Sequence, residues 1–92
     1  MDRLIGFRQR IDEIDEQLVM LLNLRAEQAQ AIGRIKHASG EAVYQPAREA
    51  EVLAHVRQVN HGPLDDAAMT RLFERIIDEA RRLERLADGP ER

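Results

Sequence analysis

The sequence predicts an all-α protein of three helices, in the order long, short and medium. Apolar residues recur at intervals of three and four along most of the chain, which is typical of helices that pack on one face. The strict alternation that would indicate strands is missing, and Gly or Pro stands where the helical pattern breaks. The relative lengths of the helices further predict an intertwined homodimer.

The first helix is expected to occupy the first forty residues, which contain no proline. Asp2 can cap its start, and Ser39 followed by Gly40 can end it. Gly33 lies inside this helix, where it either allows a neighbouring helix to come close or is simply tolerated. Ten positions spaced by three and four form the seam of the helix, and eight of them are apolar: Leu4, Phe7, Ile11, Ile14, Leu18, Leu21, Arg25, Gln28, Ile32 and Ile35.

Two shorter helices follow the first. Pro46 suits the first position of the second helix, which is expected to continue to about Asn60. Asp65 can cap the third helix, which is expected to end at Asp88. We assign residues 1–88 to one helical domain and residues 89–92 to a tail or the start of a linker.

The predicted helix lengths indicate how the chain assembles. At 1.5 Å per residue the first helix is about 55 Å long, the second about 22 Å and the third about 34 Å. A compact domain of this size has a radius of gyration of about 12 Å, so a single chain would leave much of the first seam in water. Two chains with crossed long helices would cover each other's seams.

Composition narrows the functional classes. With no cysteine, the chain lacks a disulfide framework, a thiolate metal site and a cysteine nucleophile. Its formal net charge of −3 argues against nucleic acid or an anionic membrane as a partner. No apolar run approaches the roughly 20 residues of a membrane span and no targeting signal is visible, so the expected location is cytoplasmic. The three histidines lack metal-ligand spacing, and no metal or cofactor is expected.

Charged side chains stand where the helical pattern favours apolar ones. Arg25 occupies a seam position, and Lys36, eleven residues later, points nearly the same way. Arg48 opens the second helix on its apolar face, and Glu84 lies on the apolar stripe of the third. Arg8 faces about 100° away from Arg25, so it cannot easily serve the same pocket within one chain, but in a crossed dimer it could reach the partner's pocket.

Two interpretations of these charges stay open. Each arginine can reach solvent along its aliphatic stem or pair with a carboxylate, and Glu84 can pair with Arg81. The cations outnumber the inward carboxylates, however, and a small ligand with more than one carboxylate would supply the missing negative charge. A phosphate-binding glycine loop, a Ser-His-Asp arrangement and paired carboxylates at useful spacing are missing from the sequence.

The other charges of the third helix are interpreted as a solvated face. Arg81 and Arg82 are adjacent and are expected to point to water. Arg75 with Glu79 and Asp78 with Arg82 are four residues apart, which predicts two ion pairs along the helix.

Five segments, taken in order and spacing, form a specific pattern: FRQRIDEID at 7–15, LLNLR at 21–25, IGRIK at 32–36, VYQPARE at 43–49 and LFERII at 72–77, followed by Glu84. This pattern resembles the all-helical chorismate mutases over essentially residues 4–87. The resemblance implies an intertwined dimer with two identical sites, in agreement with the helix lengths. It also implies the rearrangement of chorismate to prephenate in the route to phenylalanine and tyrosine, without a cofactor, a transferred proton or a covalent bond to the enzyme.

The resemblance assigns roles to individual residues. It places Arg25 and the partner's Arg8 on the substrate carboxylates, with Arg48 lining the same pocket. Lys36 would donate to the ether oxygen and a carboxylate, and Glu49 would take the ring hydroxyl. These groups would hold the dianion in a compact conformation and stabilise charge that grows on the ether oxygen.

Three positions depart from the common bacterial pattern. Many relatives have aspartate at the position of Gln45 and a hydroxyl residue at that of Ala80, which affects the fine positioning of the substrate. Glu84 stands where a family side chain donates to the ether oxygen, and glutamine is common there. A carboxyl donates only when it is protonated, so activity is expected to decline as the pH rises.

Other functions remain possible for the same residues. An isochorismate–pyruvate lyase would share the fold and the cations. A regulatory domain would bind chorismate or prephenate without turnover, within or beside another enzyme of the shikimate pathway, to which the tail at 89–92 could link it. A purely structural dimerisation module would favour Leu or Ile at position 25.

Overall fold

The computed structural model describes residues 3–87, which form three helices: α1 (Arg3–Ser39), α2 (Pro46–Val59) and α3 (Asp66–Leu86). The predicted all-α class and the long, short and medium order are confirmed. The predicted cap Asp2 and the predicted tail at 89–92 lie outside the described residues.

The start and stop signals that fall within residues 3–87 are confirmed, whereas the predicted end of the third helix at Asp88 lies outside them. Gly40 has a φ of +78°, the left-handed conformation that ends many helices. The N–H of Glu41 donates to the carbonyl of Lys36 at 2.9 Å, which closes the last turn of α1. The predicted proline is the first residue of α2. Asp65 caps α3, since its Oδ1 accepts the N–H of Ala68 at 2.8 Å.

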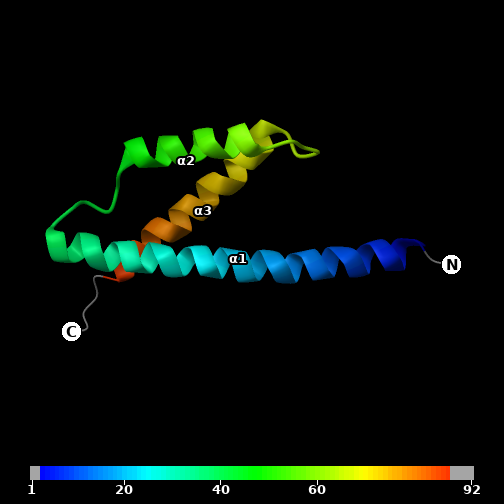
Figure 1. The fold of residues 1–92 in the computed structure, drawn as a ribbon, viewed down its shortest axis with the longest axis horizontal. Helices are drawn as coiled ribbons and strands as arrows, with labels where there is room; N and C mark the ends of the chain where they lie inside the picture. The colour runs from blue at the N-terminus through cyan, green and yellow to red at the C-terminus, as the bar shows by residue number, and fades with distance from the viewer. Residues whose placement is uncertain (1–2, 88–92) are drawn as a thin grey trace.

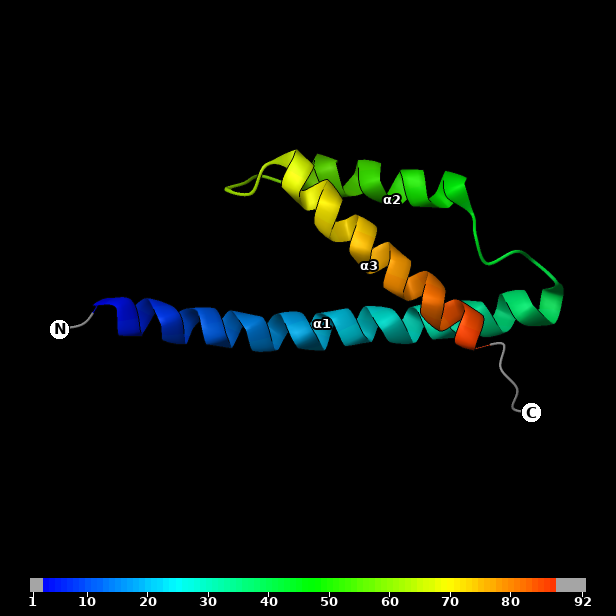
Figure 2. The ribbon, with the colours of Figure 1, turned by 180° about the vertical axis from the view of Figure 1, so that it is seen from behind.

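The three helices form an open arrangement (Figure 1). α1 and α2 run in opposite directions, and α3 passes diagonally from the end of α2 to the C-terminal half of α1. The view from behind confirms that the N-terminal half of α1 extends away from both other helices (Figure 2). The radius of gyration is 16.7 Å, against about 12 Å for a compact domain of this length.

The apolar seam of α1 is largely exposed in a single chain. Phe7 is 68% exposed and Leu21 is 56% exposed. Within the described residues only three hydrophobic side chains are buried, Ala29, Val56 and Ile77, and each keeps an exposed fraction of 5 to 8%. The prediction that one chain leaves much of this seam in water is therefore confirmed, and three buried side chains are a small core for a stable domain.

α1 and α3 meet at Gly33. A Cβ atom at this position would lie 2.7 Å from both the Cα and the carbonyl oxygen of Glu84, and 3.1 Å from the Cβ of Ala87. Because the two closest atoms belong to the backbone, any side chain at position 33 would push the helices apart. Of the two interpretations of Gly33, close approach of a neighbouring helix is confirmed.

None of the helices in residues 3–87 combines the length and the hydropathy that crossing a membrane requires.

We predict that Gly33→Ala destabilises the fold, because the added methyl group would clash with backbone atoms of Glu84, which cannot rotate away as a side chain could. The expected loss is about 1–3 kcal/mol of unfolding free energy, measured by urea denaturation at a fixed chain concentration. Gly6→Ala is the matched control, since no atom lies within 4 Å of its added Cβ. That variant should gain about 0.5–1 kcal/mol from helix propensity. Equal stability of the two variants would contradict the close crossing.

Candidate functional site

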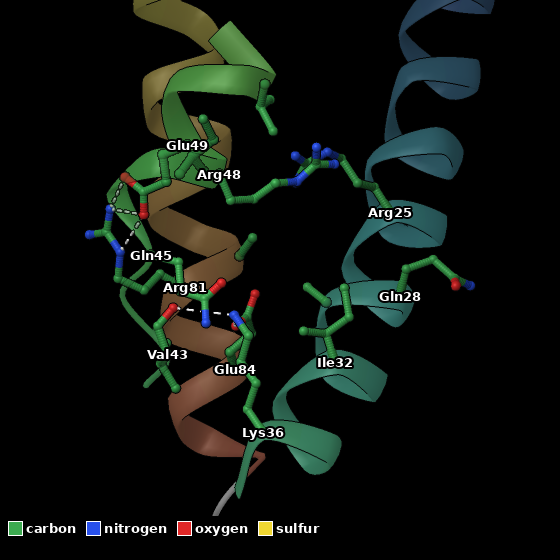
Figure 3. A pocket seen from close by; sticks show the side chains of 14 residues that line it. Arg25, Gln28, Ile32, Lys36, Val43, Gln45, Arg48, Glu49, Arg81 and Glu84 are labelled. Carbon is green, nitrogen blue, oxygen red and sulfur yellow. Dashed lines mark hydrogen bonds and ion pairs between the residues drawn. The ribbon is translucent and has the colours of Figure 1, made fainter. Parts of the chain in front are cut away.

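A cavity of about 420 Å³ lies between the three helices and the loop that joins α1 to α2 (Figure 3). Seven of the eight residues predicted to bind substrate line it: Arg25, Lys36, Gln45, Arg48, Glu49, Ala80 and Glu84. The eighth, Arg8, lies 17 residues before Arg25, or about 25 Å along the same helix. The chain therefore gathers every predicted residue at one place except the one expected from a partner.

Helical spacing explains which α1 side chains reach the cavity. Arg25, Ala29, Ile32 and Lys36 line its wall and follow one another by four, three and four residues, so they share one face of the helix. Ala29 and Ile32 give this wall an apolar surface between two cations. This stretch of the predicted seam therefore forms a wall of the cavity, with the cations Arg25 and Lys36 at its two ends.

Lys36 and Glu84 form an ion pair in the cavity wall. The Nζ of Lys36 donates to Oε1 of Glu84 at 3.0 Å and to the carbonyl of Val43 at 3.4 Å. The side chains of Lys36 and Glu84 are only 13% and 14% exposed. Gly33 makes this contact possible, because it lies one turn before Lys36 and allows α3 to approach at Glu84 itself. Glu84 pairs with Lys36 and not with Arg81, the partner considered from the sequence.

Two arginines reach toward each other across the cavity. Figure 3 shows the side chain of Arg25, from α1, and that of Arg48, from α2, pointing toward each other from opposite walls. Arg25 is half-buried and makes no hydrogen bond or ion pair with another residue of the described chain. Within residues 3–87, Arg48 forms an ion pair only with the exposed Glu51, at 3.3 Å. Guanidinium groups that point toward each other without a carboxylate between them are suited to bind an anion.

Arg81 corrects the sequence interpretation, which placed it on a solvated face. Its side chain is 21% exposed and lines the cavity. Its Nε donates to Oε2 of Glu49 at 3.0 Å, and its Nη2 donates to Oε1 and Oε2 at 2.8 and 2.6 Å. Hydrogen bonding to Glu49 raises the pKa of Arg81 above its ordinary value. Arg81 follows Ile77 by four residues, so the helical period could have placed it beside the apolar stripe.

The other ion pairs of α3 are partly as predicted. Arg75 pairs with Glu79 at 2.8 Å, which confirms that prediction. The predicted pair of Asp78 with Arg82 is wrong, because Asp78 contacts Arg81 at 3.4 Å and Arg82 pairs with Glu79 at 3.0 Å. The hydrogen bond from Arg82, followed by the charge of Arg75, lowers the pKa of Glu79.

The charges around the cavity match a ligand with two negative charges. Its lining holds four cationic side chains and two carboxylates, so its formal net charge is +2. Within residues 3–87, no three His, Asp or Glu side chains are grouped as a metal site would need. The arrangement can bind a small dianion and place fixed donors beside an oxygen that gains charge.

Known proteins are similar to this chain in sequence and in fold. Residues 7–85 match the model of the family described as chorismate mutase type II. The bifunctional chorismate mutase/prephenate dehydratase of Stutzerimonas stutzeri is 46% identical over 88 residues, which cover 90% of this chain and 24% of that protein. The chain spans about a quarter of the length of the bifunctional relatives it matches.

Solved structures resemble more than nine tenths of the chain. Form II of the chorismate mutase from Thermus thermophilus has a TM-score of 0.91 and 32% sequence identity, covering 96% of this chain and 100% of that one. The chorismate mutase of Helicobacter pylori, solved in complex with prephenate, has a TM-score of 0.83 and 30% identity, with 91% of each chain covered.

Proposed function

Because the chain belongs to the chorismate mutase type II family, we propose that it catalyses the rearrangement of chorismate to prephenate in the cytoplasm. The observation that carries this proposal is the cavity of formal charge +2, which suits a dianion such as chorismate. The relatives named as chorismate mutases, and the prephenate complex of the H. pylori protein, support it.

The reaction requires positioning and charge stabilisation from the protein. One C–O bond of chorismate breaks while one C–C bond forms within the same molecule, so neither a nucleophile nor a proton acceptor takes part. The enzyme accelerates such a step by holding the compact conformation in which the two carbons meet. It also stabilises the negative charge that grows on the ether oxygen as the C–O bond breaks.

The cavity offers a group for each task. Arg25 and Arg48 point toward each other across it and would bind the substrate carboxylates. Lys36 would donate to the ether oxygen, and its contacts with Glu84 and the carbonyl of Val43 hold its ammonium in place before substrate arrives. Glu49 would accept the hydrogen bond of the ring hydroxyl.

Gln45 and Ala80 also line the cavity, but they offer no charged group to the substrate. Gln45 lines the cavity while its Nε2 donates to the carbonyl of Ala42 at 3.3 Å. Ala80 adds apolar surface without a hydrogen-bonding group. Both would shape the pocket around the substrate, whereas the reaction itself would depend on the charged groups.

A second copy of the chain would complete each site. The exposed seam along the N-terminal half of α1 favours a homodimer in which two α1 helices cross. In such a dimer the N-terminal half of one α1 would lie over the C-terminal half of the other. The partner's Arg8 would then reach the cavity and contact a substrate carboxylate, which Arg8 of the same chain is too far away to do.

The names of the relatives support a metabolic partner. Four of them are bifunctional chorismate mutase/prephenate dehydratases. We infer that prephenate made at this site passes to a dehydratase, either fused to the chain or associated with it.

We predict that Arg25→Ala lowers kcat/KM for chorismate by about 10²–10³, because an unpaired cation facing the substrate is lost. The assay follows formation of prephenate, with sedimentation to show that the assembly is unchanged. Arg34→Ala is the control, since this exposed arginine of α1 does not line the cavity, and the variant should retain activity.

The same assay on the wild type distinguishes the alternative functions. If the wild type converted isochorismate to salicylate and pyruvate but left chorismate unchanged, the lyase would be favoured. Binding without turnover would favour a regulatory domain.

We also predict that kcat declines from acid to neutral pH. Glu84 accepts a hydrogen bond from Lys36, and it can donate to the ether oxygen only when it carries a proton. Glu84→Gln should flatten this decline, because an amide donates at every pH. A pH-independent wild type, or a Glu84→Gln variant that keeps the same slope, would exclude this role.

A further inference from the structure

Arg81 lines the cavity, although the resemblance to the chorismate mutase family assigns it no role. We propose that it is a positioning residue, which fixes the carboxylate of Glu49 to receive the hydroxyl group of the substrate. This inference rests on the proposed function, since it concerns the same cavity and the same ligand.

The hydrogen bonds between Arg81 and Glu49 fix the orientation of the carboxylate. Two nitrogens of the guanidinium contact both oxygens, at 2.6 to 3.0 Å, and the side chains of Glu49 and Arg81 are 25% and 21% exposed. Such paired contacts hold the two planes together. A carboxylate has about four acceptor positions, so after these three contacts Glu49 can still accept one hydrogen bond. The acceptor is thus fixed before a ligand arrives.

Arg81 is itself held from several sides. Its Nη1 lies 3.4 Å from Oδ1 of Asp78, and its guanidinium carbon lies 5.0 Å from the centroid of the Tyr44 ring. The guanidinium thus joins α3 to the start of α2 and to the loop before it. Every nitrogen of Arg81 already faces a carboxylate, whereas Arg25 faces none within the described chain. Arg81 is therefore suited to orient Glu49 and poorly placed to bind the substrate directly.

Charge balance adds a second reason for this role. Glu49 places a negative charge in the wall of a cavity that would bind a dianion. Arg81 offsets that charge at contact distance, so the hydroxyl acceptor is present without repelling the substrate carboxylates. Because the ring hydroxyl takes no part in bond breaking, its contact should stabilise the bound substrate and the transition state equally. Loss of such a contact raises KM and leaves kcat nearly unchanged.

The test measures kcat and KM for chorismate in single and double variants. Arg81→Met should raise KM about tenfold and change kcat by less than about threefold. Arg81→Lys keeps the charge but not the two-nitrogen contact, so its KM should lie between those of wild type and Arg81→Met. In a Glu49→Gln background, Arg81→Met should add less than about twofold to KM, because the two residues act through one contact.

Controls separate this role from a general effect on folding. Arg71→Met changes an exposed arginine of α3 that does not line the cavity, and it should keep the wild-type KM. Urea unfolding checks that each variant is folded under the assay conditions. If Arg81→Met does not fold, the comparison of KM is made with Arg81→Lys instead. An unchanged KM in Arg81→Met would overturn the inference. So would a full tenfold rise in the Glu49→Gln background, which would mean that Arg81 acts independently of Glu49.

Failure of the proposed function would look different. A folded wild type that does not convert chorismate would contradict the activity, and prephenate affinity measured by calorimetry would then replace KM in the same set of variants. Turnover by the wild type together with an unaffected Arg81→Met would overturn only the role of Arg81.

Discussion

The crossing of α1 and α3 at Gly33 determines where the charges of the cavity lie. Because position 33 has no side chain, the backbone of α3 reaches α1 at Glu84. Lys36, one turn further along α1, then lies within hydrogen-bond distance of the Glu84 carboxylate. A wider crossing would separate this ion pair and open the cavity between the helices. The stability of the crossing and the arrangement of the site therefore depend on the same contact.

The cations of the cavity fall into two groups. Lys36 and Arg81 are each held by a carboxylate from another helix, which fixes their positions. Arg25 and Arg48 instead point toward each other from opposite walls of the cavity, where a ligand can reach them. This division suits a reaction that needs a substrate to be held and a growing charge to be stabilised. Donors that are already fixed need not move when negative charge grows on the ether oxygen, so little energy is spent on reorganising the protein.

Much of the fold could be predicted because its signals are local. Apolar spacing by three and four predicts the helices, and Gly40 and Asp65 mark where one ends and another begins. The structure contains these helices. The role of Gly33 was undecided, since spacing along one helix does not show which helix packs against it. Arg81 was misinterpreted for a similar reason: it adjoins Arg82 in a charged run, and its partner Glu49 is 32 residues away. Local rules identify the face of a helix but not a distant partner.

We propose that each site takes Arg25 from one chain and Arg8 from the other. A mixed dimer of Arg8→Ala and Arg25→Ala chains tests it most directly, because one of its two sites would lack both arginines and the other would be complete. We predict that both variant homodimers are nearly inactive and that the purified mixed dimer recovers about half of the wild-type kcat per dimer. A mixed dimer no more active than the two homodimers would contradict a site shared between chains.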